Sequence, residues 1–434
     1  MKTKRFAKSK ISLTLLSLLA LSSTCFAEPV ENLQKPLAIQ TAVLDAKPIE
    51  VHVKDLPPPR PEESVSVGSR KAPPPTNATL SAPAGFKVNV FAQGIPRARW
   101  LAVTPDGDLL CAASQQNTIY LLRDTNNDGT ADEIHTFLDQ SNGANAPFGM
   151  TFQGEHFYVA NTDAVLRYDY KKGQTTLTSK PVKITELPGG GYHQHWTRNV
   201  QVSPDGKKLY VTIGSRSNNR VEPAPRASVI VMNLDGSDRK VFASGLRNPV
   251  GLAFHPTTHE AYVTVNERDG IGHDLVPDYF TRIRQDEFFG WPYVYFTPEN
   301  VDPRIRQQQL DEAANLIAKT RQPDVLFQAH SAALGLAFYD KKQFPERYHN
   351  GAFAAFHGSW NRKPATGYKV VFIPFNDGKP TGQYEDFVTG FLLNDNTAST
   401  WGRPTGVTIM PNGDLIFTDD MAGRIFRVSY NKPE

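Results

Sequence analysis

The sequence predicts an all-β protein that folds as a six-bladed β-propeller. Two observations indicate this class: a unit of two apolar strands joined by a turn recurs six times, and the first four units are spaced by about 50 residues. Units of about 40–50 residues that hold several short strands are typical of propeller blades. Pro-Asp-Gly and Pro-Asn-Gly triplets supply turns in which glycine tolerates a positive φ. The six units begin at Arg99, Pro147, Thr197, Asn248, Ala333 and Pro404.

Each unit places a second apolar strand after its turn. These strands are expected at Leu109–Ala113, His156–Asn161, Lys208–Ile213, Glu260–Val265, Ala352–His357 and Asp414–Thr418. The longest insertion between units, residues 298–320, contains the helical pattern Gln307–Lys319, which we expect on a surface loop.

The first 27 residues predict an export signal. Five basic residues precede the apolar run Ile11–Leu21, and Cys25-Phe-Ala27 offers a small-residue cleavage site. The run is too short and too rich in serine for a membrane span, so we expect no transmembrane segment in the mature chain. A periplasmic or secreted protein follows. Acylation of Cys25 is the less favoured alternative, because Ser22 fits poorly as the apolar residue expected before a lipoprotein cysteine.

Charge and composition divide the remaining chain and exclude one function class. Residues 1–27 carry five basic and no acidic side chains, so their removal changes the formal charge from +3 to −2. This excludes a nucleic-acid footprint. Residues 28–84 are rich in proline and predict a flexible segment that is either a tether or a wrap over the domain surface. Residues 85–432 form the propeller domain.

Titratable residues gather just before the predicted inner strands. In a propeller these positions converge on one mouth of the central channel, the usual ligand site. Arginines at this density suit an anionic ligand, and histidine suits a general base near neutral pH. The residues are His193, His195, Arg198, Arg247, Asn248, Glu267, Arg268, Asp269, His330, Trp360, Asn361, Arg362 and Arg403.

Seven stretches carry a resemblance to a known family. They are Gly190–Arg198, Gly245–Phe254, Asn266–Asp274, Phe289–Tyr293, Ala329–Ala333, Gly358–Arg362 and Trp401–Pro404. Together they resemble the sugar dehydrogenases that depend on pyrroloquinoline quinone (PQQ), specifically the sorbosone dehydrogenase-like branch related to soluble glucose dehydrogenase. The resemblance covers residues 85–432 and implies PQQ and calcium as cofactors.

The resemblance implies a role for several residues. His195 would be the general base that takes a proton from the sugar, with His193 as the alternative if the alignment slips. Arg247 would stabilise charge at the reacting carbonyl. The backbone carbonyls of Arg268 and Asp269 would hold the calcium of the cofactor, which polarises the quinone. We expect the cofactor to be bound by Arg198, Arg247, Asn248, His330, Arg362 and Arg403.

The sequence departs from the glucose dehydrogenase pattern at two places. An aspartate that orients the catalytic histidine is replaced by Ser215, so a different group is expected to orient His195. The calcium loop reads Glu267-Arg-Asp269 in place of Gln-Gly-Pro. Both departures fit the sorbosone branch, and the substrate is therefore expected to be an aldose or a sugar aldehyde. The electron acceptor, a quinone or a cytochrome, is not indicated.

Other interpretations of these residues stay open. Two histidines beside Gln194 are compatible with a zinc site, although no third ligand has metal spacing. His330 is as compatible with a satisfied core position as with the cavity. At the level of function, the alternatives are a calcium-dependent, lactonase-like hydrolase and a non-catalytic, sugar-binding propeller.

A separate acidic loop is a candidate structural calcium site. Its oxygen ligands alternate, and a glycine stands at the sixth position, as in calcium loops. The twelfth position is His135 where an EF-hand has glutamate, so a plain acidic turn is equally expected. The candidate ligands are Asp124, Asn126, Asp128 and Asp132.

Overall fold

The structure is a computed structural model that describes residues 31–189 and 194–431. The predicted export signal with Cys25, and His193, lie outside the described residues. In the described part of the chain, no helix is both long enough and apolar enough to cross a membrane.

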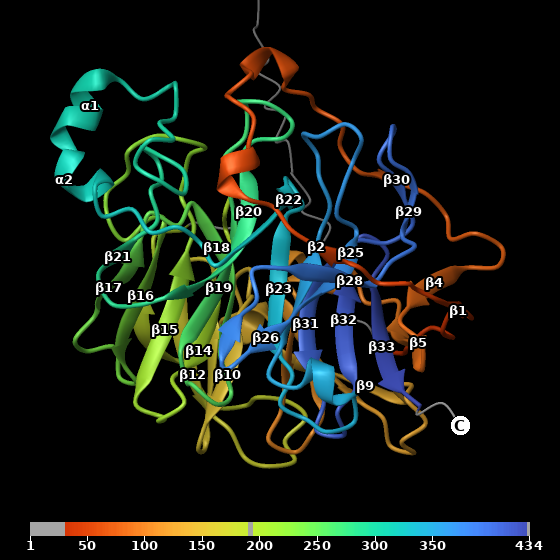
Figure 1. Cartoon of the computed structure of the whole chain (residues 1–434). Helices are drawn as coiled ribbons and strands as arrows, with labels where there is room; N and C mark the ends of the chain where they lie inside the picture. Colours follow the sequence, from red (N-terminus) through yellow and green to blue (C-terminus); the bar gives the residue numbers. More distant parts are fainter. Residues whose placement is uncertain (1–30, 190–193, 432–434) are drawn as a thin grey trace, which may run out of the picture.

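Most of the described strands form six sheets of four or five strands, and three smaller sheets hold the others (Figure 1). The first sheet contains β6 (Trp100–Val103), β7 (Leu109–Ala113), β8 (Thr118–Arg123) and β9 (Glu133–Leu138). The second contains β10 (Met150–Gln153), β11 (His156–Ala160), β12 (Ala164–Asp169) and β13 (Val182–Glu186). The third contains β14 (Val200–Val202), β15 (Lys208–Ile213), β16 (Ser228–Asn233), β17 (Lys240–Ser244) and β21 (Glu287–Phe288).

The remaining three sheets also begin with the first strand of a sequence unit. The fourth contains β18 (Asn248–Phe254), β19 (Ala261–Asn266), β20 (Pro277–Ile283) and β22 (Val325–Ala329). The fifth contains β23 (Ala333–Phe338), β24 (Ala352–Phe356), β25 (Lys369–Ile373), β28 (Tyr384–Val388) and β2 (Pro48–Ile49). The sixth contains β31 (Pro404–Ile409), β32 (Leu415–Asp419), β33 (Arg424–Tyr430) and β5 (Phe86–Gln93).

The first strands of successive sheets contact one another in a cycle. The order is β6, β10, β14, β18, β23 and β31, and β31 in turn contacts β6. The sixth sheet combines both ends of the domain, because β5 pairs antiparallel with β33 from Phe86 opposite Tyr430 to Gln93 opposite Arg424. The all-β expectation is confirmed, and the six predicted units fall on the six sheets.

Glycines explain how the first strands pack so closely. A Cβ atom at Gly335 would lie 2.5 Å from the carbonyl oxygen of Thr405, in the first strand of the next sheet. Only a residue without a side chain permits this backbone approach. The equivalent glycines in three other sheets, with the backbone atoms that their Cβ would meet, are Gly149 (Val200 N, 2.3 Å), Gly251 (Leu334 O, 2.5 Å) and Gly406 (Arg99 O, 2.5 Å). These four glycines are therefore a packing requirement of the cycle.

The insertion in the fourth sheet is helical in two short pieces. The pattern predicts one helix over Gln307–Lys319, whereas the structure has α1 (Gln307–Glu312) and α2 (Ala314–Ile317). The separation occurs at Ala313, whose φ of −98° and ψ of 5° lie outside helical values. The insertion lies at the edge of the molecule, as expected (Figure 1).

Residues 31–84 run along the surface of the six sheets (Figure 1). β1 (Gln40–Val43) pairs with β4 (Thr79–Ala82), β2 extends the fifth sheet through β28, and β3 (Arg70–Lys71) pairs with β30 (Ser399–Thr400). Between β2 and β3 the segment crosses the upper end of the sheets (Figure 1).

Candidate active site

One cavity of about 770 Å³ lies where the ends of the sheets converge. Its wall receives residues that precede first strands, such as His195 before β14, and residues that follow second strands, such as Glu267 after β19. The structure therefore brings together positions far apart in the sequence, as predicted. The predicted site residues that line the cavity are His195, Arg247, Asn248, Glu267, Asp269, His330, Trp360, Asn361 and Arg403.

Ser215 orients the imidazole of His195. The Nδ1 atom of His195 lies 2.9 Å from the carbonyl oxygen and 3.0 Å from the hydroxyl oxygen of Ser215. The Ser215 hydroxyl donates its single hydrogen to the carbonyl of Ser217 at 2.6 Å, so both Ser215 oxygens are acceptors toward His195. The proton is therefore on Nδ1, and Nε2 has the lone pair of a base.

This contact corrects the expectation that a group other than residue 215 would orient His195. Serine replaces the carboxylate of the related pattern and does so with two neutral acceptors. The neighbouring Gly214 allows the contact, because a Cβ there would lie 2.5 Å from Oδ1 of Asn248 and 2.8 Å from the Cβ of His195.

His195 is neutral near neutral pH. Burial lowers the pKa of His195 to about 3, and the nearby positive charge of Arg247 acts in the same direction. The residue also has a φ of 49°, a left-handed conformation that is uncommon outside glycine and concentrates at functional sites.

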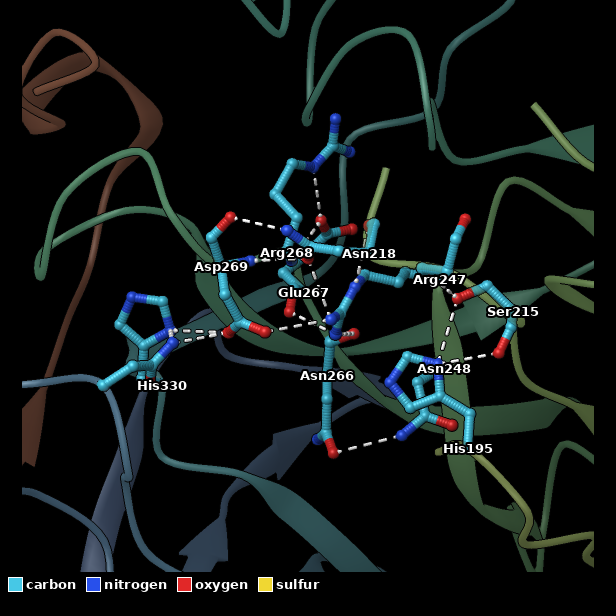
Figure 2. Close-up of polar contacts among 12 residues, drawn as sticks. His195, Ser215, Asn218, Arg247, Asn248, Asn266, Glu267, Arg268, Asp269 and His330 are labelled. Carbon is cyan, nitrogen blue, oxygen red and sulfur yellow. Dashed lines mark hydrogen bonds and ion pairs between the residues drawn. The ribbon is translucent and has the colours of Figure 1, made fainter. Parts of the chain in front are cut away.

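Arg247 is held by four groups in the cavity wall (Figure 2). Its Nη2 atom lies 3.0 Å from Oδ2 of Asp269 and 3.0 Å from Oδ1 of Asn218, and Nη1 donates to the carbonyl of Glu267 at 2.6 Å. Nε donates to the carbonyl of Asn218 at 3.1 Å. A guanidinium fixed in this way is pre-organised for an oxygen-rich ligand.

Asp269 links Arg247 to a second histidine. Burial opposes its ionisation, but Arg247, His330 and Asn361 together lower the pKa of Asp269 to about 2. Asn361 donates to its Oδ1 at 2.5 Å, and Nδ1 of His330 lies 3.5 Å from the same oxygen. Figure 2 shows His195 on one side of Arg247 and the Asp269–His330 pair on the other. His330 is thus both buried and part of the cavity wall.

Two predicted cofactor residues do not line the cavity. Arg198 is fully buried and donates to the carbonyls of Pro188, His195 and Thr197 at 2.6–2.7 Å. It therefore supports the loop that carries His195. Arg362 donates to the carbonyl of His273 at 2.7 Å and pairs with Asp274. Its side chain is committed to this neighbouring loop.

The two carbonyls expected to bind calcium differ in their contacts. The carbonyl of Asp269 accepts from Asn218 at 2.8 Å and from Arg304 at 2.6 Å, which occupies both lone pairs. The carbonyl of Arg268 accepts only a long contact of 3.5 Å from the backbone nitrogen of Val276. A calcium ion held by the carbonyls of Arg268 and Asp269 stays a prediction.

The cavity does fit a planar anionic cofactor such as PQQ. Arg99, Arg247 and Arg403 all line it. Oδ1 of Asn248 and Oε1 of Glu267 are buried without a hydrogen-bond partner among the described residues, which indicates polar contacts that a bound group would complete.

A second polar cluster in the cavity was not predicted. The carboxylate of Asp420 accepts a hydrogen bond from Nε of Arg403 at 2.9 Å and lies 3.0 Å from Nε2 of His357. It also forms an ion pair with Arg99. Burial lowers the pKa of His357 to about 4. Arg99 also lies over the ring of Trp196 at 5.4 Å. Asp420 and His357 follow second strands just as Glu267 does, so applying that positional rule to every unit would have found them.

The acidic loop between β8 and β9 uses its oxygens internally. Oδ2 of Asp132 accepts from the backbone and the hydroxyl of Thr125, each at 2.7 Å. The Asp124 carboxylate accepts from the backbone of Asp128 at 3.2 Å and of Gly129 at 2.8 Å. The described residues contain no group of three or more histidine, cysteine or acidic side chains placed to hold a metal. A calcium ion at Asp124, Asn126, Asp128 and Asp132 stays a prediction.

Comparison with known proteins identifies the family. Residues 80–287 and 300–431 match the TrAA12-like family model. The chain belongs to this family. The expected relationship to PQQ-dependent sugar dehydrogenases is thereby confirmed.

Individual relatives are distant. An uncharacterized protein of Borreliella burgdorferi is 29% identical over 369 residues, which cover 82% of this chain and 92% of that protein. A PQQ-dependent pyranose dehydrogenase of Coprinopsis cinerea is 24% identical over 401 residues, and the match spans 79% of this chain and about half, 53%, of the enzyme. The solved holo PQQ domain of pyranose dehydrogenase from Coprinopsis cinerea has a TM-score of 0.67 at 21% identity, covering 84% of this chain and 100% of that domain.

Proposed function

We propose that the chain is a PQQ-dependent dehydrogenase that oxidises an aldose or a sugar aldehyde. The observation that carries the proposal is a neutral histidine, His195, whose basic Nε2 results from the Ser215 contact and which shares a cavity with the fixed Arg247. The fold of the Coprinopsis cinerea domain and the name of that enzyme supply the cofactor class. We further propose that the six sheets are the blades of a six-bladed propeller.

Five side chains of this cavity would hold the cofactor. Arg247 and Asn248 line the cavity together with His195, and His330 lies beside Asp269. Arg99 and Arg403, which both pair with Asp420, add positive charge. Bound PQQ provides a quinone that accepts a hydride. Arg247 would stabilise the negative charge that develops on the accepting side.

His195 would move the proton of the reaction. As the sugar C–H bond breaks and its electron pair leaves as hydride, Nε2 of His195 takes the proton of the hydroxyl on the same carbon. A cyclic aldose then becomes a lactone, and a hydrated aldehyde becomes an acid. The proton later leaves His195 to solvent, which the low pKa of the buried imidazole favours.

Reconstitution tests the proposal. The purified chain is titrated with PQQ, followed by its absorbance, with and without calcium, and dye reduction is then measured with aldoses, sugar aldehydes including sorbosone, and lactones. We expect PQQ binding and dye reduction with at least one sugar or aldehyde. Lactone hydrolysis without dye reduction would support the hydrolase alternative, and saccharide binding without turnover would support a non-catalytic protein.

Matched histidine variants identify the base. His195→Gln is expected to lower kcat by about 100-fold or more while PQQ still binds. His193→Gln tests the alternative histidine, and His135→Gln in strand β9 is the control for loss of any histidine. Full activity of His195→Gln would overturn the role of this residue.

The calcium and export predictions are tested alongside. Arg304→Gln frees one lone pair of the Asp269 carbonyl, so an unchanged calcium affinity in this variant would place the ion away from that carbonyl. We also propose that the mature chain is periplasmic or secreted, which the N-terminus of the protein recovered from cells would establish.

A further inference from the structure

The N-terminal segment supplies a wall of the cavity that lies outside the family-matched residues. Residues 60–72, here called the strap, cross the mouth of the cavity, whereas the family model begins at residue 80. Gly68 and Ser69 of the strap are among the residues that line the cavity. In Figure 1 the strap is part of the orange segment that passes over the upper end of the sheets.

The strap is attached to loops of three sheets. At one end, the backbone of Arg60 donates to the carbonyl of Ile271 at 2.8 Å, and Gly272 donates to the Ser64 hydroxyl at 3.1 Å. In the middle, Val67 donates to the carbonyl of Trp360 at 2.6 Å. At the other end, Arg70 donates to the carbonyl of Ala398 at 2.9 Å. These contacts hold the strap at a defined position over the cavity.

The strap lies as an extended chain with one face inward. Val65, Val67 and Ser69 are partly buried, whereas the alternate residues Ser66 and Gly68 are exposed. This period of two is the pattern of a strand laid on a surface. It places the Ser69 hydroxyl on the inner face.

The hydrogen bonds of Ser69 define what it can bind. Its Oγ lies 2.8 Å from the hydroxyl of Tyr368, and Tyr368 donates its only hydrogen to the carbonyl of Ser359 at 2.8 Å. Ser69 must therefore donate to Tyr368, which leaves the Ser69 oxygen as an acceptor. Burial raises the pKa of Tyr368, so the phenol keeps the hydrogen that fixes this arrangement.

We propose that Ser69 is a specificity determinant that accepts a hydrogen bond from a hydroxyl group of the bound saccharide. The proposal deepens the proposed function and rests on it for the class of ligand. An acceptor oxygen selects a hydroxyl donor over a carboxylate or a deoxygenated carbon, because the alternatives leave it unpaired or repel it. The strap then makes this chain more selective among sugars than its six sheets alone.

Gly68 keeps the space beside Ser69 open. A Cβ atom at Gly68 would meet no other atom within 4 Å, and its backbone is not left-handed, so larger side chains fit without strain. Because Gly68 lines the cavity from the exposed face of the strap, a bulky residue here would stand at the mouth of the cavity without displacing the fold. This position therefore provides a steric test of the wall.

Binding of saccharides that cannot be oxidised tests the proposal independently of turnover. Methyl glycosides of glucose, galactose, mannose and xylose are titrated into the full chain, with and without PQQ, by calorimetry. We expect at least one to bind, Ser69→Ala to weaken it about tenfold, and Ser69→Thr to retain it. Gly68→Trp is expected to abolish binding, whereas Gly68→Ala and the strap control Arg70→Trp are not.

A deoxy-sugar cycle then assigns the contact. The monodeoxy analogue that lacks the hydroxyl bound by Ser69 should bind the wild type about tenfold more weakly and Ser69→Ala no more weakly than the parent glycoside does. If no glycoside binds the wild type, or if Ser69→Ala and Gly68→Trp bind as the wild type does, the proposal is overturned. A chain that binds glycosides through Ser69 but reduces no dye would overturn only the dehydrogenase proposal.

Discussion

The guanidinium of Arg247 and the carboxylate of Asp269 form an ion pair of 3.0 Å in the wall of the cavity. Arg247 is 3% exposed and Asp269 is 20% exposed, so both charges depend on each other for solvation. The pair lies between the proposed base and the buried His330 (Figure 2). The charges of this pair therefore act on both of these histidines of the cavity wall.

Asp269→Asn is expected to destabilise the fold by about 3 kcal/mol, because it leaves the Arg247 charge without its counterion. The free energy of unfolding is measured by denaturant titration. Asp238→Asn is the matched control: Asp238 pairs with Lys208 at 3.3 Å on the surface, where loss of the pair should cost less than about 1 kcal/mol. Equal effects of the two variants would contradict the structural role of Asp269.

Ser215→Asp is expected to shift the acid limb of the kcat/KM profile to higher pH by about one unit. A carboxylate beside Nδ1 stabilises the protonated imidazole, so the pKa of His195 rises from its low value and the base is lost at higher pH. Ser215→Ala should keep the limb near its original place, because the Ser215 carbonyl still holds Nδ1. The pH profile is compared with that of Ser237→Asp on an exposed turn. Coincident profiles of Ser215→Asp and the wild type would refute the contact.

His357 makes stability fall as the pH is lowered. The unfolded chain takes up a proton on this histidine near its ordinary pKa of about 6.5, whereas the folded chain does so only near 4. Stability from the neutral buried ring is therefore present above about pH 6.5 and is lost as the pH falls toward 4.

The variant His357→Gln should reduce the slope of unfolding free energy against pH by up to about 1.4 kcal/mol per pH unit in this window. Part of the slope should remain, because the pKa of His195 is lowered as well. Denaturant titrations between about pH 4.5 and 7.5 measure it, with His135→Gln as the control. An unchanged slope in His357→Gln would show that this histidine does not titrate in that way.

Gly335→Ala is expected to destabilise the protein by about 1–3 kcal/mol. The added methyl group would meet the carbonyl of Thr405 at 2.5 Å and the backbone nitrogen of Val407 at 2.7 Å, so two first strands would have to separate. Gly68→Ala, whose methyl group meets nothing within 4 Å, is the matched control. Thermal unfolding of both variants decides the matter, and equal melting temperatures would contradict the packing role of Gly335.

The repeating units were predictable because their physical causes are local. Each unit shows its own turn residues and its own apolar runs. The first and second strands of the six sheets coincide with these apolar runs. The helix over Gln307–Lys319 was only partly correct, since the break at Ala313 depends on the packing of the insertion. The course of residues 31–84 was left open, because proline-rich sequence determines extended backbone but not the surface on which it lies.

The sequence predicted which residues lie at the cavity but not which groups they contact. Position relative to the strands was enough to select His195, Arg247 and Asp269. It could not show that Arg198 turns toward backbone carbonyls, because buried arginines and cavity arginines look alike in sequence. The contact of Ser215 was not predicted, because the related pattern has a carboxylate at this position, whereas here a carbonyl and a hydroxyl together accept from the same nitrogen.

The joining of β5 to β33 fixes the order in which the cavity can be completed. Arg403 and Asp420 belong to the sixth sheet, whose strands come from opposite ends of the domain. This sheet is complete only when β33, near the end of the described chain, pairs with β5 at the start of the domain. A single cut that releases residues 424–430 should therefore disable a cavity whose other walls remain in place.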